Sequence, residues 1–443
     1  MSTEGVTRRN FVKTTGGAAL GALAWPAASG AAQLAGAPRR YAIVGTGVRG
    51  VGMWGRPIVS GFKDAATFVG LCDTNPLRLE AGKRRIGADC PTYTNLDQML
   101  DTAKPDLLMV TTVDATHSAC IINALERGID VATEKPMVID EAQCQAVLDA
   151  ERRTGKKVIV TFNYRYAPKH QRIKELLMAG EIGQVTSVDF SWYLDTSHGA
   201  DYFRRWHRLR NRSGSLWVHK ATHHFDLINW WLDADPVTVA ATGRLANYGK
   251  NGPFRHTTCR GCPHASRCSY HWDVTRNQEL VDLYVNAESA DGYQRDGCVF
   301  KEDVDIFDTM NAVVQYSNGV NMSYSLNAFM PFEGYRLAFN GTEGRLEVRD
   351  YERQPWKVDG PTEIYLTRNF GERETITVPE ATGGHGGGDD ILRNLVFRNT
   401  RVASHLQLPT SRAGALSCLT GIAARRSSDI GGQIVRLGDL VKI

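Results

Sequence analysis

The amino-acid sequence predicts an α/β protein whose first domain is a doubly wound parallel sheet. Three observations support this fold class. A short apolar run at residues 41–44 is followed at once by the glycine pattern Gly45-x-Gly47-x-x-Gly50. A second apolar run ends in an acid at the place where a ligand-binding strand end is expected. Further apolar runs alternate with helical stretches, which is the pattern of a parallel sheet.

Five strands are expected in this first domain, in chain order. Each is a short apolar run, and stretches with helical character separate them, such as HSACIINALERG at residues 117–128. The expected strands are residues 41–44, 67–73, 106–112, 129–134 and 157–163.

The glycine pattern and the acid after the second strand predict a dinucleotide site. The glycines let the backbone approach the pyrophosphate, whose charge meets the N-terminus of the following helix. Asp73 lies 23 residues after Gly50, close to the spacing of a carboxylate that binds a ribose hydroxyl. A carboxylate there would repel a 2′-phosphate, so we expect NAD. Arg49 is a nearby basic group and keeps NADP as the alternative.

Length and composition exclude several classes of protein. The chain has 443 residues, of which 42% are hydrophobic and 23% charged, with a net charge of +4. These values describe a globular protein of two or three domains. Arg8, Arg9 and Lys13 supply much of the positive charge, so the remainder is nearly neutral and nucleic-acid binding is not expected. No later segment has the roughly 18 apolar residues of a transmembrane helix, so no membrane anchor is expected.

The first residues resemble a twin-arginine export signal. TRRNFVK at residues 7–13 contains Arg8 and Arg9, and a weakly apolar stretch of small residues follows to residue 28. That stretch is too short to span a bilayer. We therefore expect residues 1–38 to be a signal and linker, and the protein to be exported to the periplasm or beyond by the twin-arginine machinery. A disordered terminus with a chance arginine pair is the alternative.

One short stretch concentrates ionisable groups. VHKATHHFD at residues 218–226 contains three histidines, a lysine and an aspartate. His219 and His223 lie four residues apart and Asp226 follows three later, so on a helix they share one face. Zinc would accept such a histidine pair, and so would proton transfer to a bound substrate. A merely polar helix is the third interpretation, and the spacing alone does not decide.

Several separate motifs span nearly all of the chain from about residue 41: EKPMVID from Glu134, TTVDATHSACIINALERGIDV, NYRYAPKHQRIKELLMAGEIGQV and GGHGGGDDIL. Together they resemble the Gfo/Idh/MocA oxidoreductases, a family named for glucose–fructose oxidoreductase and inositol dehydrogenase. The resemblance implies a Rossmann domain at residues 39–163. It also implies a second α/β domain at residues 164–443 with a large, open, mostly antiparallel sheet, an active site between the domains, and homo-oligomers.

The resemblance also assigns roles to residues. His223 and Asp226 stand where the family has a histidine and an aspartate, whereas His219 stands where an aspartate is usual. Lys135 is expected to hold the reacting hydroxyl and relay its proton, with His223 as first and His219 as second acid–base candidate. The expected cofactor contacts are Gly45, Gly47, Val48, Arg49, Gly50, Asp73, Thr112, His117, Glu134, Lys135 and Arg165. The expected substrate contacts are Asp226, Lys220, Trp206 and His385.

Four cysteines lie in an insertion around residues 255–300 of the second domain. Cys259, Cys262 and Cys268 form a C-x2-C-x5-C pattern, and Cys298 follows thirty residues later. Four thiolates suit a structural zinc ion, which is favoured because a twin-arginine substrate folds in the reducing cytoplasm. Disulfides, an iron–sulfur cluster and unlinked thiols are the alternatives.

Together these expectations predict an NAD(P)-dependent oxidoreductase. It would transfer a hydride between a nicotinamide and a secondary hydroxyl of a sugar, sugar derivative or cyclitol. Free NAD is expected to be scarce outside the cytoplasm, so the cofactor would be tightly held. The alternative is a redox-neutral, NAD-dependent glycosidase that acts by transient oxidation, elimination and hydration. A binding protein that retains only the fold is a third, non-enzymatic interpretation.

Overall fold

The computed structural model describes residues 38–357, 360–379 and 381–443. The predicted export signal, including Arg8 and Arg9, lies outside these ranges. Within them, no helix combines the length and the apolar character that crossing a membrane requires.

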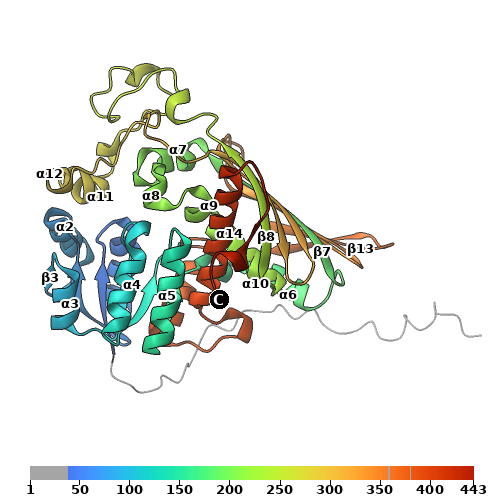
Figure 1. The fold of residues 1–443 in the computed structure, drawn as a ribbon, viewed down its shortest axis with the longest axis horizontal. Helices are drawn as coiled ribbons and strands as arrows, with labels where there is room; N and C mark the ends of the chain where they lie inside the picture. The colour runs from blue at the N-terminus through green and yellow to red at the C-terminus, as the bar shows by residue number, and fades with distance from the viewer. Residues whose placement is uncertain (1–37, 358–359, 380) are drawn as a thin grey trace, which may run out of the picture. The chain divides into compact units, whose positions relative to one another are not determined.

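The first sheet has six parallel strands in the order β3-β2-β1-β4-β5-β6 (Figure 1). This is the strand order of doubly wound dinucleotide-binding folds, and the order reverses between β1 and β4, where ligands bind. The predicted fold class and all five predicted strands are confirmed, and the two-residue β3 was not predicted. The strands are β1 Arg39–Val44, β2 Ala66–Cys72, β3 Thr92–Tyr93, β4 Leu107–Val110, β5 Asp130–Thr133 and β6 Val158–Val160.

Helices cover both faces of this sheet, so the central strand β4 is buried along its whole length. Local sequence sets where the helices begin. The side chains of Asn75, Asn95 and Asp140 each accept a hydrogen bond from a backbone N–H in the first turn of α2, α3 and α5. The helices are α1 Arg56–Gly61, α2 Pro76–Ile86, α3 Leu96–Ala103, α4 His117–Glu126 and α5 Glu141–Thr154.

The second sheet has nine strands in the order β14-β13-β12-β11-β7-β10-β9-β8-β15 (Figure 1). Among the described strands, neighbours pair antiparallel except for β7 and β10, which confirms a large, mostly antiparallel sheet. The strands are β7 Val185–Asp195, β8 Pro236–Arg244, β9 Thr309–Tyr316, β10 Asn321–Met330, β11 Glu333–Gly341, β12 Gly344–Arg353, β13 Thr362–Arg368, β14 Arg373–Val378 and β15 Val435–Arg436.

Side chains alternate between buried and exposed along β9, so one face of this sheet is packed and the other is not. Helix α14 packs on β8, where Ser427 Oγ accepts a hydrogen bond from the Ala241 N–H (2.8 Å). Oligomerisation through the open face stays a prediction. The helices are α6 Pro168–Met178, α7 Thr196–Arg204, α8 Arg210–Ser213, α9 Leu216–His219, α10 Ala221–Leu232, α11 Gln278–Leu280, α12 Glu288–Asp291, α13 Gly388–Arg398 and α14 Ser411–Asp429.

The histidine stretch forms the junction of α9 and α10. Helix α9 ends at His219, α10 begins at Ala221, and Lys220 between them keeps a helical backbone. The two helices are almost entirely buried, because apolar residues such as Trp217 and Phe225 pack into the core around them. Burial on this scale fixes the direction in which the polar side chains of the stretch point.

Candidate active site

A cavity of about 970 Å³ lies where the two sheets' loops meet, and residues of both predicted domains line it. Its walls come from the glycine-rich loop, the ends of β2, β4 and β5, the α9–α10 junction and the insertion before β9. The predicted site residues that line it are Gly45, Gly47, Val48, Arg49, Asp73, Thr112, His117, Glu134, Lys135, Trp206, His219, Lys220, His223 and His385. Gly50 lies behind the loop, and Arg165 and Asp226 lie elsewhere.

The glycine-rich loop is shaped to admit a dinucleotide. Gly45 has φ +96°, and a Cβ there would lie 2.6 Å from the Thr111 carbonyl oxygen. A Cβ on Gly50 would lie 2.1 Å from the Gly45 carbonyl oxygen. Only glycines let this turn close, and the turn leaves its backbone facing the cavity. The donor set and its geometry therefore fit a pyrophosphate.

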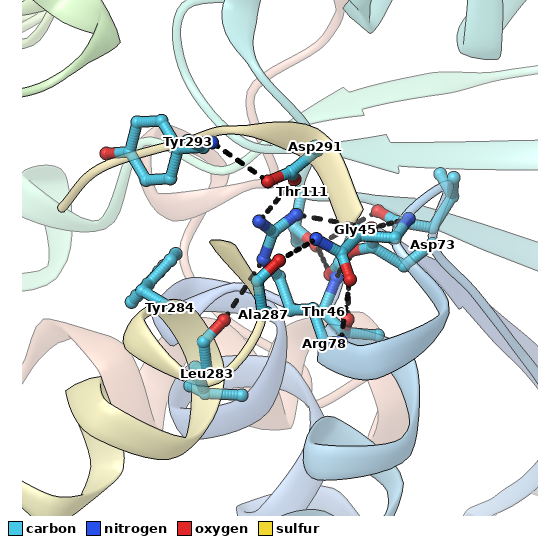
Figure 2. Close-up of polar contacts among 12 residues, drawn as sticks. Gly45, Thr46, Asp73, Arg78, Thr111, Leu283, Tyr284, Ala287, Asp291 and Tyr293 are labelled. Atoms are coloured by element: carbon cyan, nitrogen blue, oxygen red, sulfur yellow. Dashed lines mark hydrogen bonds and ion pairs between the residues drawn. The ribbon is translucent and has the colours of Figure 1, made fainter. Parts of the chain in front are cut away.

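Asp73 anchors the start of the glycine-rich loop. Its Oδ2 accepts hydrogen bonds from the backbone N–H and the hydroxyl of Thr46, both at 2.8 Å, and its Oδ1 accepts from the Asn75 N–H at 2.9 Å (Figure 2). Arg78 Nη1 lies 3.4 Å from the same Oδ1. The carboxylate is thus held in place at the strand end predicted for a ribose-binding acid.

Arg49 also lines the cavity, and its guanidinium is paired with Glu134. It donates Nε and Nη2 to Glu134 Oε1 at 3.2 and 2.7 Å, and Trp54 Nε1 donates to the same oxygen at 2.7 Å. The basic group that kept NADP open as an alternative is therefore paired with a buried acid after β5.

Lys135 projects into the cavity from the loop after β5. Its Nζ donates a hydrogen bond to the His219 carbonyl oxygen at 3.0 Å, and burial lowers its pKa to about 8. The peptide bond from Lys135 to Pro136 is cis. His117 ties this loop to β4, because its Nδ1 and Nε2 lie 2.8 and 3.1 Å from the carbonyl oxygens of Pro136 and Thr112. The amine is thus held in place, and its pKa lies close to neutral pH.

His219 is oriented by an acid that sequence reasoning missed. Its Nδ1 lies 2.5 Å from Asp114 Oδ2, and both groups are buried. Burial lowers the pKa of His219 well below its usual value, so the ring is neutral. With the ring proton on Nδ1, Nε2 remains an acceptor. Asp73 follows β2 directly, whereas Asp114 lies in the short helical turn between β4 and α4; its place in the loop after a parallel strand is the signal that could have identified it.

His223 carries a free ring nitrogen. Its Nδ1 is buried and has no hydrogen-bond partner among the described residues. The ring packs on that of Tyr164, with centroids 4.5 Å apart, and burial lowers its pKa well below the usual value. His385 lies beside it, with ring centroids 6.2 Å apart, and Asp389 Oδ1 is 3.1 Å from its Nδ1. The His223 imidazole, which lines the cavity, is therefore neutral.

Lys220 is a buried lysine that makes no direct ion pair among the described residues. Its side chain is 3% exposed, and within the described ranges no ion pair or hydrogen bond involves its Nζ. The ammonium lies 4.8 Å from the ring centroid of Trp192 and 5.6 Å from that of Tyr164. Burial lowers its pKa. Because Lys220 lines the cavity, its amine can donate hydrogen bonds to an oxygen-rich ligand bound there.

Arginines and an aromatic side chain form the outer wall of the cavity. Trp206 stacks on His207 with centroids 3.6 Å apart and meets His219 edge-on at 5.7 Å. Arg205 is paired with Asp201 at 3.1 Å. Trp206, predicted as a substrate contact, thus lies next to His219, whose carbonyl oxygen accepts the hydrogen bond from Lys135.

Two predicted site residues bind each other instead. Arg165 Nε and Nη2 donate to the two Asp226 oxygens at 2.7 and 2.5 Å; Asp226 is buried, and 11% of the Arg165 side chain is exposed. Neither lines the cavity. Although Asp226 follows His223 by three residues, its carboxylate turns toward the guanidinium after β6. This pair joins the turn after β6 to α10, and the structure does not bring it to the cavity.

The predicted zinc site is not supported. All nine cysteines are free thiols, and the described residues contain no group of three or more His, Cys, Asp or Glu placed to hold a metal ion. The thiols have other partners, because Cys259 Sγ accepts from Arg204 Nη1 at 3.1 Å and Cys298 Sγ from the Phe300 N–H at 3.5 Å. Cys268 packs against the apolar core. Cys259, Cys262, Cys268 and Cys298 are therefore four separate thiols in this structure.

Comparison with known proteins identifies the family. A family model described as "Oxidoreductase family, NAD-binding Rossmann fold" matches residues 39–162, and a second, described as "Oxidoreductase family, C-terminal alpha/beta domain", matches residues 174–435. The chain belongs to the Gfo/Idh/MocA oxidoreductase family. The predicted resemblance, the NAD-binding domain and the oxidoreductase class are confirmed.

Individual relatives agree with this assignment. YteT of Bacillus subtilis (strain 168) is 38% identical over 404 residues, which cover 86% of this chain and 94% of YteT. An inositol 2-dehydrogenase of Rhizobium meliloti (strain 1021) is 28% identical over 206 residues, 46% of this chain and 58% of that protein. A solved structure of levoglucosan dehydrogenase with NADH and levoglucosan matches with a TM-score of 0.64 at 18% identity, over 90% of this chain and 99% of that one. At this identity, the likeness shows the fold.

Proposed function

We propose that this Gfo/Idh/MocA protein transfers a hydride between tightly held NAD and a secondary hydroxyl of a sugar, sugar derivative or cyclitol. One observation carries the proposal. The cavity that begins at the glycine-rich loop and Asp73 ends at Lys135, His219 and His223, so a single bound dinucleotide and its substrate would share one enclosed space. When bound, the nicotinamide supplies the acceptor or donor of the hydride.

The chain's own residues handle the proton. Oxidation of an alcohol releases a proton from the hydroxyl, and neutral Lys135 can accept it at Nζ, since its pKa is about 8. His219, held by Asp114, offers Nε2 as a hydrogen-bond acceptor for the same or a neighbouring hydroxyl. His223 lines the same cavity, and its Nδ1 is buried without a hydrogen-bond partner among the described residues. In the reverse direction, protonated Lys135 returns the proton to the forming hydroxyl.

The polar lining supports a polyhydroxylated substrate. Lys220 and the imidazoles offer several donors and acceptors within one cavity, whereas an apolar alcohol would leave them unpaired. Family relatives named for inositol and levoglucosan support the same substrate class. Asp73 favours NAD over NADP, because its carboxylate would repel a 2′-phosphate.

We also propose export by the twin-arginine route, on the basis of Arg8, Arg9 and the apolar stretch after them. A protein exported in the folded state can take up NAD in the cytoplasm and keep it. Tight retention then allows repeated turnover where free NAD is scarce, because a second sugar substrate can take the hydride back from the bound NADH and regenerate NAD. Fractionation of cells that produce the natural chain and an Arg8→Lys/Arg9→Lys variant would test this, with loss of the exported form expected for the variant.

The proposed activity has a direct test. The protein without residues 1–37 is purified without added nucleotide and denatured, and the released dinucleotide is identified by mass. Stoichiometric NAD is expected. The protein is then offered myo-inositol, glucose and levoglucosan while nicotinamide absorbance is recorded, and reduction by at least one is expected. Release of nitrophenol from nitrophenyl glycosides without an added acceptor would instead favour the glycosidase alternative.

A further inference from the structure

A segment of the second domain lies on the dinucleotide-binding domain. Residues 278–293, called here the strap, comprise α11, a π-helical turn at Val281–Val285, α12 and the two residues after it. The strap belongs to the insertion that precedes β9. In Figure 1, α11 and α12 lie next to α2, and hydrogen bonds from α2 to the strap confirm that the two are in contact.

Polar contacts attach the strap to the first domain along its whole length. Asn75 Nδ2 donates to the Ala287 carbonyl oxygen at 2.9 Å, and this bond is buried. Arg78 donates Nε to the Leu283 carbonyl oxygen at 3.2 Å (Figure 2). Ion pairs join Arg56 to Glu279 at 2.8 Å, Arg85 to Asp282 at 2.6 Å and Arg78 to Asp291 at 2.6 Å.

Apolar packing attaches it as well. Leu280, Leu283 and Tyr284 are buried in the same apolar cluster as Trp54 and Ile86 of the first domain. A segment that shares a core with the sheet it covers cannot swing away without exposing that core. The strap is therefore a fixed part of the nucleotide-binding domain, although it comes from the other half of the sequence.

The strap forms a wall of the cavity and does not fill it. The glycine-rich loop and Asp73 line one side, and Leu280, Tyr284 and Asp291 of the strap line the side that faces them. The volume of about 970 Å³ is at the upper end of the range for ligand sites. A ligand on the glycine-rich loop would accordingly lie between the loop and the strap.

Tyr284 faces the point where the loop would bind phosphate. Its hydroxyl accepts a hydrogen bond from the Val48 N–H at 3.1 Å, and a Cβ on Gly47 would lie 2.9 Å from the same hydroxyl oxygen. Backbone N–H groups of such loops are the donors to the pyrophosphate. A phenol hydroxyl both accepts and donates. When a phosphate binds, the Val48 N–H can therefore donate to a phosphate oxygen in place of the Tyr284 hydroxyl. The hydroxyl can then donate its own hydrogen to the same phosphate oxygen.

The ribose end is closed by the same segment. Arg78 joins Asp73 to Asp291, with its nitrogens 3.4 and 2.6 Å from the two carboxylates. Its third contact is the Leu283 carbonyl oxygen. All the guanidinium's contacts are thus used to hold the strap beside the ribose-binding acid.

We propose that the strap encloses the dinucleotide and makes its release slow, with Tyr284 binding the pyrophosphate and the Asp291–Arg78–Asp73 chain closing the ribose end. The proposal rests on the proposed function, because it takes the dinucleotide as the ligand of the cavity. It assigns cofactor retention to residues outside the glycine motif. A dinucleotide would leave only by losing the Tyr284 hydrogen bond and passing beside the strap.

The test measures release of bound NADH and does not use turnover. The protein is loaded with NADH, unbound nucleotide is removed, excess NAD is added, and the decay of bound-NADH fluorescence gives the dissociation rate. Tyr284→Phe removes the hydroxyl and keeps the buried ring, so it is expected to release NADH roughly tenfold faster. Asp291→Asn is expected to speed release severalfold. Asp282→Asn is the matched control, because it breaks a strap ion pair that does not line the cavity, and its rate is expected to stay within about twofold of the unaltered protein.

The outcomes separate the two proposals. If the unaltered protein holds NADH and both Tyr284→Phe and Asp291→Asn release it at the same rate, the strap proposal is wrong and the proposed function stands. If the unaltered protein binds no dinucleotide, the proposed function and the strap fail together. Thermal unfolding of each variant checks that the buried packing of Tyr284 is intact.

Discussion

The pKa of Lys135 provides the sharpest test of the catalytic assignment. Burial lowers this pKa from 10.5 to about 8. If neutral Lys135 accepts the proton of the hydroxyl, alcohol oxidation must follow the neutral fraction of this amine. The rate then rises with pH and levels off above the pKa.

The expected size follows from that pKa. The neutral fraction is about 1% at pH 6 and about 90% at pH 9, so kcat/KM is expected to rise about 90-fold between them. Between pH 9 and pH 10 the change should be only about 1.1-fold, whereas a lysine at the ordinary value would give about eightfold. An oxidised nicotinamide adds positive charge, which moves the plateau to lower pH.

Two measurements check this. The pH profile of kcat/KM with the best substrate gives the pKa of the cofactor-loaded enzyme before substrate binds. Limited amine acylation followed by peptide mass spectrometry gives the titration of Lys135 without any substrate. Lys135→Arg is the informative variant, because it keeps the positive charge but cannot deprotonate. It is expected to abolish the plateau and lower the rate at pH 9 by at least about 100-fold.

A rate that keeps rising through pH 10, together with an acylation midpoint near that of an exposed lysine, would refute the assignment. So would a Lys135→Arg variant with the rate and pH profile of the unaltered enzyme. Lys135 would then only position the substrate, and His223 would become the first candidate for the base.

Three further predictions follow. Asp114→Asn removes the acid that orients His219 and is expected to lower kcat by about 100-fold with little change in dinucleotide binding; kinetics and NADH fluorescence titration check both. Gly50→Ala places a Cβ 2.1 Å from the Gly45 carbonyl oxygen and is expected to abolish dinucleotide retention. Gly52→Ala is the control, because its Cβ would meet no atom within 4 Å, and it is expected to retain the dinucleotide. Mass analysis of the bound nucleotide distinguishes the two variants. Arg165→Ala leaves Asp226 buried without its partner and is expected to cost about 3–5 kcal/mol in urea unfolding, against less than about 1 kcal/mol for the exposed Arg152→Ala.

Local patterns were sufficient to predict the first domain. Apolar runs that are buried on both faces need no distant information to be recognised, and the glycine pattern encodes its own turn. The two-residue β3 is too short to give such a pattern. Asp73 was predicted because an acid directly after the second strand is expected to bind the ribose. Asp114 could have been identified in a similar way, because it lies in the loop after another parallel strand, β4.

Side-chain direction could not be predicted in the same way. Helical spacing places Asp226 near His223, yet the choice between the cavity and Arg165 depends on a residue about sixty positions earlier. The cysteine spacing suggested a metal site, but the loop around Cys259 places its thiol against the Arg204 guanidinium, which donates a hydrogen bond to it. Tyr284 gives no local signal at all, because its contact with Val48 depends on how the insertion crosses the first domain.

One carboxylate connects the residues just after the strap to the cavity wall that contains Arg205. Asp201, at α7, pairs with Arg205 of that wall at 3.1 Å and with Arg295, two residues beyond the strap, at 2.6 Å. Burial would raise the pKa of Asp201, but the two arginines outweigh it and lower the pKa to about 2. The carboxylate therefore stays charged, and this link persists over the whole range in which Lys135 titrates. The groups proposed to enclose the cofactor and those proposed to face the substrate are thus held together by contacts that do not change with the protonation of the proposed base.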